Sequence, residues 1–274
     1  DLIVKSGQFA LADLVSGTRS ERSLGAQMQL ANALRDHGDH AQATPNYRAV
    51  LQRSEDKLGK DHPNTAYAQM ALANNLRIRI DSEAEPTLEE LCKELDVEKV
   101  PGPAAGGGRG GAKHNAAAVA LLHHAQKLYK EAEQTLRAEF KSVHPMTIAA
   151  RLNAVVLSID LAEHIPAYKS EANQVLADLY ADCLEAYGEK HELTVYVMAK
   201  QGELQFRYGE TPTDSQKGKH QMLEAKKRYE ALKLGDSHPR VQELKARMHM
   251  KPGGVSHNPT MSALARGLTM GPMG

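Results

Sequence analysis

The chain has 274 residues, of which 41% are hydrophobic and 25% charged, and its formal net charge is zero. A neutral balance argues against general binding to nucleic acid or to an anionic membrane, because both need a surplus of basic residues. Two cysteines are too few for a disulfide framework, so we expect a reducing intracellular compartment and a cytoplasmic location. The start at Asp1 rather than Met predicts that the chain is part of a longer protein.

Most of the chain carries the apolar spacing of helices. We expect residues 1–20 to supply the second helix of an incomplete unit that caps the domain. Apolar residues three or four positions apart then recur in the stretches 23–38, 66–80, 147–163 and 177–188. Aromatic residues make up only 4% of the chain and Trp is absent, so the core must consist of Ala, Leu, Val and Met. Apart from the short run 193–198, strand patterns are absent, which predicts an all-α fold.

A long insertion interrupts the helical pattern at 81–113. Its first part is acidic and amphipathic over 87–100 and predicts a short helix. Its second part is a Pro-Gly tract that cannot bury a core, so we expect a flexible insertion. The helical domain is expected to span 21–250 and to contain this insertion. We expect the tail, 251–274, to be flexible as well.

A Leu-Gly-x-x-His-Pro motif separates the helices. It is complete at 58–63 and 234–239, and the fragments VHPMT and KHELT, at 143–147 and 190–194, keep its histidine. Proline fixes its own φ and moves the preceding residue out of the helical region, so one helix ends before the motif and another begins directly after it. Thr65 and Thr147, each two residues past a proline, are expected to help those helices start.

Counting back 19 residues from the histidines at 62, 144 and 191 reveals a repeated stripe. A small residue is followed by a large one four positions on and by an apolar one seven positions on, which is the spacing of one buried helix face. The stripes are Ala43-Tyr47-Val50, Ala125-Tyr129-Ala132 and Ala172-Leu176-Leu179. The same count from His238 gives Lys219, Leu223 and Lys226, so we expect a degraded terminal unit, since the ends of solenoids are atypical.

The stretch 38–76, which contains GDHAQATPNYRAVL and LGKDHPNTAYAQMALANNL, resembles the tetratricopeptide repeats of the kinesin light chain class. The resemblance rests on the Gly-x-x-x-x-Ala-x-x-x-Tyr pattern, on Pro45 and on the linker motif, and it extends more weakly to residue 250. It implies a right-handed solenoid of about four to five helical hairpins, interrupted by the Gly- and Pro-rich insertion. It also implies close helix contact at small residues near the middle of the first helices, which are Ala31, Ala73, Val155 and Gly202.

In repeats of this class the first helices line a concave groove that binds a partner. The register of the resemblance places ten residues on the groove side, which are Asn32, Arg35, Tyr67, Met70, Asn74, Arg77, Leu152, Val156, Tyr196 and Glu203. Asn and Arg can hydrogen-bond a peptide, and Tyr and Met give adaptable apolar contact. In the competing interpretation Asn74 and Asn75 satisfy neighbouring helix ends, and Leu152 and Ile159 belong to the core.

No pattern in the sequence predicts catalysis, a metal site or a cofactor. Neither HExxH nor CxxC occurs, although the chain has 13 histidines and two cysteines. The Gly-rich run 106–111 lacks the Lys-Ser/Thr of a phosphate-binding loop, and no GxSxG motif marks a nucleophile. Cys183 is interpreted as a small buried residue of a helix.

The sequence therefore favours a non-catalytic scaffold or adaptor that binds a peptide or a partner subunit. No sustained heptad repeat is present, which argues against a motor light chain itself. Family analogy places such an adaptor in a cytoskeletal or ciliary assembly, for example the axoneme. Two alternatives stay open: a sensor or regulatory repeat domain of a larger enzyme whose catalytic part lies outside this chain, and RNA binding through the Gly-Arg tract at 101–113, which the neutral charge disfavours.

Overall fold

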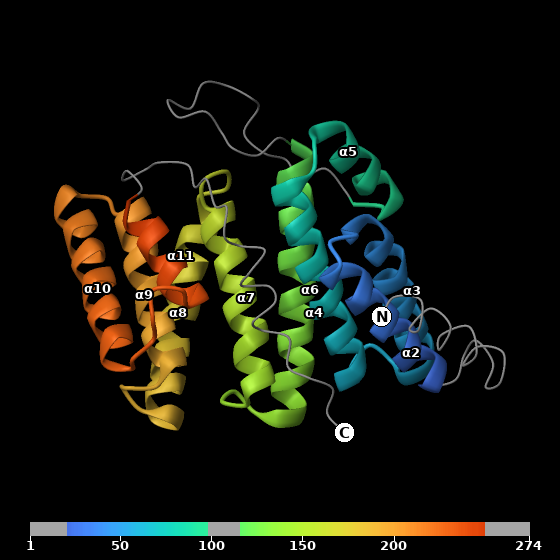
Figure 1. The fold of residues 1–274 in the computed structure, drawn as a ribbon, viewed down its shortest axis with the longest axis horizontal. Coiled ribbons are helices and arrows are strands. Elements are labelled where there is room, and N and C mark those ends of the chain that lie inside the picture. Colours follow the sequence, from blue (N-terminus) through green and yellow to red (C-terminus); the bar gives the residue numbers. More distant parts are fainter. Residues whose placement is uncertain (1–20, 98–115, 250–274) are drawn as a thin grey trace.

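The computed structural model describes residues 21–97 and 116–249, and every regular element in these ranges is an α-helix. Figure 1 shows the helices standing side by side along the long axis of the molecule. The strand-like run 193–198 lies inside a helix. The helices are α2 (Glu21–Asp36), α3 (His40–Leu58), α4 (Pro63–Ser82), α5 (Glu85–Glu94), α6 (Ala116–Phe140), α7 (Pro145–Leu161), α8 (Ala167–Tyr187), α9 (Glu192–Tyr208), α10 (Pro212–Ala231) and α11 (Pro239–Met248).

The helices pair into hairpins that stack into an open array, α2–α3, α4–α6, α7–α8 and α9–α10. First helices contact first helices: Ala66 of α4 shares a core cluster with Met146 of α7, and Arg207 of α9 pairs with Asp160 of α7. An ion pair between Lys130 and Glu171 joins the second helices α6 and α8 in the other layer. The prediction of an all-α helical-hairpin solenoid is confirmed. We call the solvent side of the first-helix layer, formed by α2, α4, α7 and α9, the inner face.

The histidine of each of the first three linkers caps the following helix. Nδ1 of His62 accepts a hydrogen bond from the backbone N–H two residues on at 3.1 Å, and His144 and His191 do the same at 3.3 and 3.2 Å. Thr65 instead donates its hydroxyl to the carbonyl of the linker glycine at 2.8 Å, and the Thr147 hydroxyl has no hydrogen-bond partner among the described residues. The capping role expected for the threonines therefore belongs to the histidines, because Nδ1 reaches an otherwise unpaired N–H of the first turn.

The stripes predicted from the histidine spacing are buried in equivalent places. Ala43, Ala125 and Ala172 are each 0% exposed, on the second helices α3, α6 and α8. The large residues four positions further on are at most 1% exposed. Small residues expected in the first helices are also buried, among them Ala31 and Ala73 at 0%. The units therefore share one packing arrangement, in which a small side chain lets two helices approach.

The expectation of a degraded fourth unit is wrong, because its stripe lies one residue earlier. Lys219 and Leu223 are exposed, whereas Gly218, Met222 and Ala225 are buried. The helix α10 ends seven residues before its linker histidine, while α3, α6 and α8 end four residues before theirs. A count made from the histidine therefore misses the stripe, since the linker length differs.

Two facing glycines allow α9 and α10 to approach very closely. A Cβ on Gly218 would lie 2.4 Å from the backbone nitrogen of Phe206 and 2.6 Å from the carbonyl oxygen of Gly202. A Cβ on Gly202 would in turn lie 2.9 Å from the carbonyl oxygen of Gly218. Backbone atoms cannot move aside as a flexible side chain can, so only glycine fits at both positions.

The start of the insertion is folded rather than flexible. Residues 85–94 form α5, which packs on α6. Leu88, Leu91 and Leu95 are 2%, 1% and 9% exposed and belong to the main hydrophobic core. The short helix predicted over 87–100 corresponds to α5, whereas the description of all of 81–113 as flexible does not hold for this first part, because its leucines at helical spacing cover an apolar surface.

Three predicted segments lie partly or wholly outside the described residues. They are the capping helix at 1–20, the Pro-Gly tract of the insertion and the tail at 251–274. Within the described ranges, none of the helices combines the length and the apolar character that crossing a bilayer requires.

Lys141 occupies a linker position that is glycine in two equivalent linkers. Its φ of 73° lies in the left-handed region, like those of Gly59 and Gly188 at 91° and 81°. A side chain in this conformation costs about 1–2 kcal/mol because Cβ crowds the following carbonyl. We therefore expect Lys141→Gly to raise the free energy of unfolding by about 1 kcal/mol, measured by urea denaturation. The reverse change, Gly59→Lys, should lower it; a destabilised Lys141→Gly variant would contradict the argument.

The glycine contact between α9 and α10 predicts a steric effect. Gly218→Ala should lower the free energy of unfolding by about 1–3 kcal/mol, because the methyl group overlaps the backbone of α9. Gly25→Ala in α2 is the matched control, since its Cβ meets nothing within 4 Å, and alanine should stabilise that helix by about 0.5–1 kcal/mol. Scanning calorimetry of both variants tests the difference, and equal shifts in Tm would count against the close approach.

Candidate protein-binding face

Half-buried side chains follow the inner side of α4. Tyr67, Met70, Asn74 and Arg77 lie three or four residues apart, so they form one stripe on this helix. Each keeps part of its surface accessible, and Tyr67 and Met70 also pack at the edge of the hydrophobic core. These four residues are the ones that the resemblance places on the groove side of the second unit.

Asn32, on α2, has a structural role as well as an accessible surface. Its Oδ1 accepts a hydrogen bond from the hydroxyl of Tyr47 at 2.7 Å, which ties α2 to α3. Asn74 and Tyr129 occupy the corresponding sequence positions of the second unit. In the third unit Leu176 replaces the tyrosine, and an apolar residue replaces the asparagine as well. An asparagine at this position therefore accompanies a tyrosine on the second helix, and its NH₂ group can still donate to a partner.

The hydroxyl of Tyr129 lies near this stripe and has no hydrogen-bond partner among the described residues. Tyr129 is 1% exposed, and burial raises the pKa of its phenol above the usual range, while the positive charges of Arg77 and Arg35 oppose that rise. The Tyr129 hydroxyl is therefore a buried polar group behind the stripe rather than part of its accessible surface.

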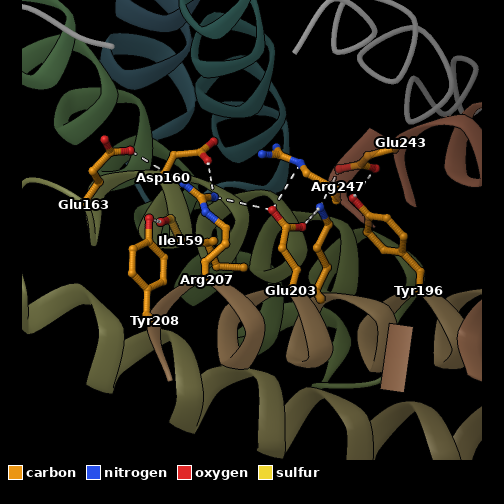
Figure 2. Close-up of polar contacts among 10 residues, drawn as sticks. Ile159, Asp160, Glu163, Tyr196, Glu203, Arg207, Tyr208, Glu243 and Arg247 are labelled. Atoms are coloured by element: carbon orange, nitrogen blue, oxygen red, sulfur yellow. Dashed lines mark hydrogen bonds and ion pairs between the residues drawn. The ribbon is translucent and has the colours of Figure 1, made fainter. Parts of the chain in front are cut away.

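A cluster of ion pairs fills the inner side of α7, α9 and α11. Figure 2 shows these side chains pointing toward one another from the three helices and the turn after α7. We define the ion-pair cluster as Asp160, Glu163, Lys200, Glu203, Arg207, Glu243 and Arg247. The five members on α9 and α11 are at most 5% exposed, so most of these charges are buried.

Glu203 is the centre of the ion-pair cluster. Its carboxylate lies 2.8 Å from Nζ of Lys200, 3.1 Å from Nε of Arg247 and 3.4 Å from Nη1 of Arg207. Three cations from two helices thus share one acid, and α11 is attached to α9 through this carboxylate.

The other acids of the cluster neutralise the same cations. Arg207 lies 3.1 Å from Asp160 and 3.7 Å from Glu163 of the α7 segment. Glu243 of α11 lies 2.5 Å from Nζ of Lys200. Every cation of the cluster therefore faces at least one carboxylate, which is the arrangement that buried charges require.

Pairing rather than burial sets the pKa values in the cluster. Burial would raise the pKa of Glu203, but Arg247, Lys200 and Arg207 lower it to about 2. Burial would likewise lower the pKa of Lys200, but Glu203 and Glu243 hold it above its ordinary value. Glu203 and Lys200 are therefore both charged at neutral pH, so the centre of the cluster is a set of paired ions rather than a proton-transfer site.

Three predicted groove residues belong to the interior of the array. Leu152 is 1% exposed and packs with Ile159 in the core between α7, α8 and α9, as the competing interpretation proposed. Val156 is 3% exposed. Arg35 is 7% exposed, and its guanidinium pairs with the neighbouring aspartate at 2.8 Å. Placing these three side chains on an open groove is corrected, because neighbouring helices cover the sides of each first helix.

Two further groove residues lie beneath α11. Tyr196 is 7% exposed and Glu203 is 3% exposed, and both contact side chains of α11. The sequence interpretation missed the partners of these residues, above all Arg207 and Arg247. The detectable signal was a pair of opposite charges, Glu243 and Arg247, four residues apart on the same side of a short helix as its apolar residues.

The outer side of the array carries an open polar pocket between α8, α9 and α10. Its volume is about 560 Å³, and its lining includes Lys169, Asn173 and Gln205. Within the described ranges, no group of three or more His, Cys, Asp or Glu side chains could hold a metal ion. Burial raises the pKa of the Cys183 thiol to about 11, so this cysteine is not a reactive thiolate.

Comparison with known protein families agrees with the packing of the helices as repeated hairpins. A family model described as tetratricopeptide repeat matches residues 23–64, which comprise most of α2, all of α3 and the linker that follows. No curated protein matches the chain. The match supports a tetratricopeptide-type protein, and the buried stripes on α6, α8 and α10 show that the same hairpin packing continues beyond the matched residues. Repeats of this type generally mediate protein–protein interaction and are typically non-catalytic.

The central position of Glu203 predicts a large effect of removing its charge. Glu203→Gln leaves Lys200, Arg207 and Arg247 buried with fewer acids, so we expect the free energy of unfolding to fall by about 3–5 kcal/mol in chemical denaturation. Glu224→Gln is the control, because the ion pair between Glu224 and Arg228 is solvent-exposed and should change stability by less than about 0.5 kcal/mol.

The pH dependence of the same variant gives a second measurement. The pKa of Glu203 is lowered from its ordinary value of 4.5 to about 2 in the folded chain. Its stabilising contribution is therefore fully present above pH 4.5 and is lost as the pH falls toward 2. Glu203→Gln cannot take up this proton, so its stability should fall less steeply across that window. Parallel curves for the two proteins would count against the assigned pairing.

Proposed function

We propose that the chain is a non-catalytic scaffold that binds a peptide segment or a partner subunit on the inner face of α2 and α4. One observation carries the proposal: the stripe of Tyr67, Met70, Asn74 and Arg77 keeps accessible surface, whereas α11 and its ions cover the inner side of α9. The α2–α4 part of the face is thus the part that an external segment can reach.

The chemistry of this stripe suits a polypeptide ligand. Tyr67 and Met70 offer apolar contact, and Asn74 and Arg77 offer hydrogen-bond donors to backbone carbonyls or carboxylates. Because the helices are already packed, the face loses little conformational entropy on binding, so several modest contacts suffice for specific affinity.

The linker motif supports the narrower assignment to repeats of the kinesin light chain type. Its histidine caps the helices that begin at residues 63, 145 and 192, so the motif determines where the first helices start. A role in a cytoskeletal or ciliary assembly, and a location at the cytoskeleton or axoneme, follow from that resemblance by analogy.

A selection of peptide ligands tests the proposed face. A phage library that displays random peptides of about 16 residues would be selected on the wild-type chain, since such lengths span a groove of this kind. Synthetic copies of the enriched peptides would then be measured by fluorescence polarisation. We expect the double variant Asn74→Ala/Arg77→Ala to bind them at least about tenfold more weakly, because one charge-assisted hydrogen bond contributes about 1.5–3 kcal/mol.

The matched control changes the same chemical groups on the outer side. Lys169→Ala/Asn173→Ala removes an amide and a cation from the outer pocket on α8 and should leave the affinities unchanged. If the α8 double variant bound the peptides more weakly and the α4 double variant bound them normally, the binding site would lie on the outer side and the proposal would be wrong. Failure to enrich any peptide on the folded chain would also count against the proposal.

A further inference from the structure

The helix α11 covers the inner side of α9 and has no second helix of its own among the described residues. It follows α10 as a first helix of a fifth unit would, and it contacts both α9 and α10. In Figure 1 it lies in front of α9, toward α7. The residues that it covers, Tyr196, Lys200 and Glu203, lie three or four positions apart on the inner side of α9.

The contact of α11 depends on charge to an unusual extent. Four residues of α11 are buried, and two of them, Glu243 and Arg247, have acidic or basic side chains that form ion pairs. In α7, by comparison, only Arg151 among 14 buried residues carries a charge. The net stabilisation from a buried ion pair is small, because the desolvation of both ions offsets their attraction, whereas buried apolar area stabilises directly. The attachment of α11 should therefore be weaker than the packing between the other first helices.

The contact is nevertheless specific in its geometry. Glu243 lies against Lys200 and accepts a hydrogen bond from the Tyr196 hydroxyl at 3.3 Å. One turn later, Arg247 lies 3.1 Å from Glu203. Between and before these charges, Leu244 and Val241 are 5% and 3% exposed against the apolar side of α9 and α10.

These contacts describe what the surface beneath α11 recognises. A matching segment is a helix with the pattern apolar-x-Glu-apolar-x-x-Arg, which α11 fulfils from Val241 to Arg247. The spacing of Glu and Arg places both on one side of the helix, opposite Lys200 and Glu203. A segment with the two charges exchanged would bring like charges together and would be rejected.

We infer that α11 is an exchangeable occupant of the inner face, and that the surface beneath it on α9 and the adjoining side of α10 binds a partner helix carrying a glutamate and an arginine four residues apart. This inference rests on the proposed scaffold role and names the class of partner for the other half of the inner face. Its test does not involve the α4 stripe, so the two proposals can fail separately.

A competition experiment on the full chain tests the inference. The double variant Glu243→Arg/Arg247→Glu places arginine against Lys200 and glutamate against Glu203, so α11 should detach while α2 to α10 stay folded, as circular dichroism would verify. A fluorescein-labelled peptide of residues 236–249 with the natural sequence is the probe. We expect it to bind the double variant at least about tenfold more tightly than it binds the wild-type chain, whose site is occupied.

The control peptide carries the same two charge exchanges and should bind neither protein. Absence of binding of the natural peptide to a folded double variant would overturn the inference, and so would equal binding to both proteins. Hydrogen exchange on the wild-type chain covers the case in which the variant does not fold. The amides of α11 should exchange faster than those of α9; exchange as slow as that of α9 would show that α11 is a fixed part of the array.

Discussion

Close approach of neighbouring helices at small side chains is the constraint on which the rest of the structure depends. No hairpin of two thin helices can cover its own apolar side, so each must lie directly against the next. Ala43, Ala125 and Ala172 make this possible on the second helices, each with no exposed surface. Where α10 meets α9 the requirement is stricter, and glycine stands on both sides of the contact. This spacing sets how far apart the first helices lie and therefore what the inner face can present.

The two halves of the inner face are built on different interactions. Around α2 and α4 a hydrogen bond from Tyr47 to Asn32 is one of the links between the layers, and the neighbouring stripe on α4 keeps accessible surface. Around α7 and α9 the corresponding surface is occupied by α11 through ions, with Glu203 shared by three cations. If both proposed sites bind partners, one open half and one half closed by α11 would separate the two binding events, since the second site must first lose its occupant.

The order of the helices was predictable from the sequence because the residues that start and end each helix act locally. Proline and histidine act within one turn of their own position, so the linker motif reveals where α4 and α7 begin, and the KHELT fragment where α9 begins. The prediction failed where it relied on a fixed number of residues between two features of the chain. The longer linker before His238 displaced the expected stripe by one residue. The amphipathic spacing predicted the helix α5, but not where it packs, because its covering surface on α6 lies beyond the Pro-Gly tract.

The candidate site was predictable only in its open half. Tyr67, Met70, Asn74 and Arg77 follow from the register of a single helix, and the fold leaves them accessible. The same register placed Tyr196 and Glu203 on an open groove, because a pattern within one helix carries no information about a helix that returns to cover it. The sequence by itself determined the helical class, the helix starts and the buried stripe of the first three units, all of which depend on residues a few positions apart. Only the tertiary structure decided which part of the inner face is open. Glu203 and Arg247 are buried because two segments more than 40 residues apart in the sequence pack together, and the partners in this ion pair lie on different helices.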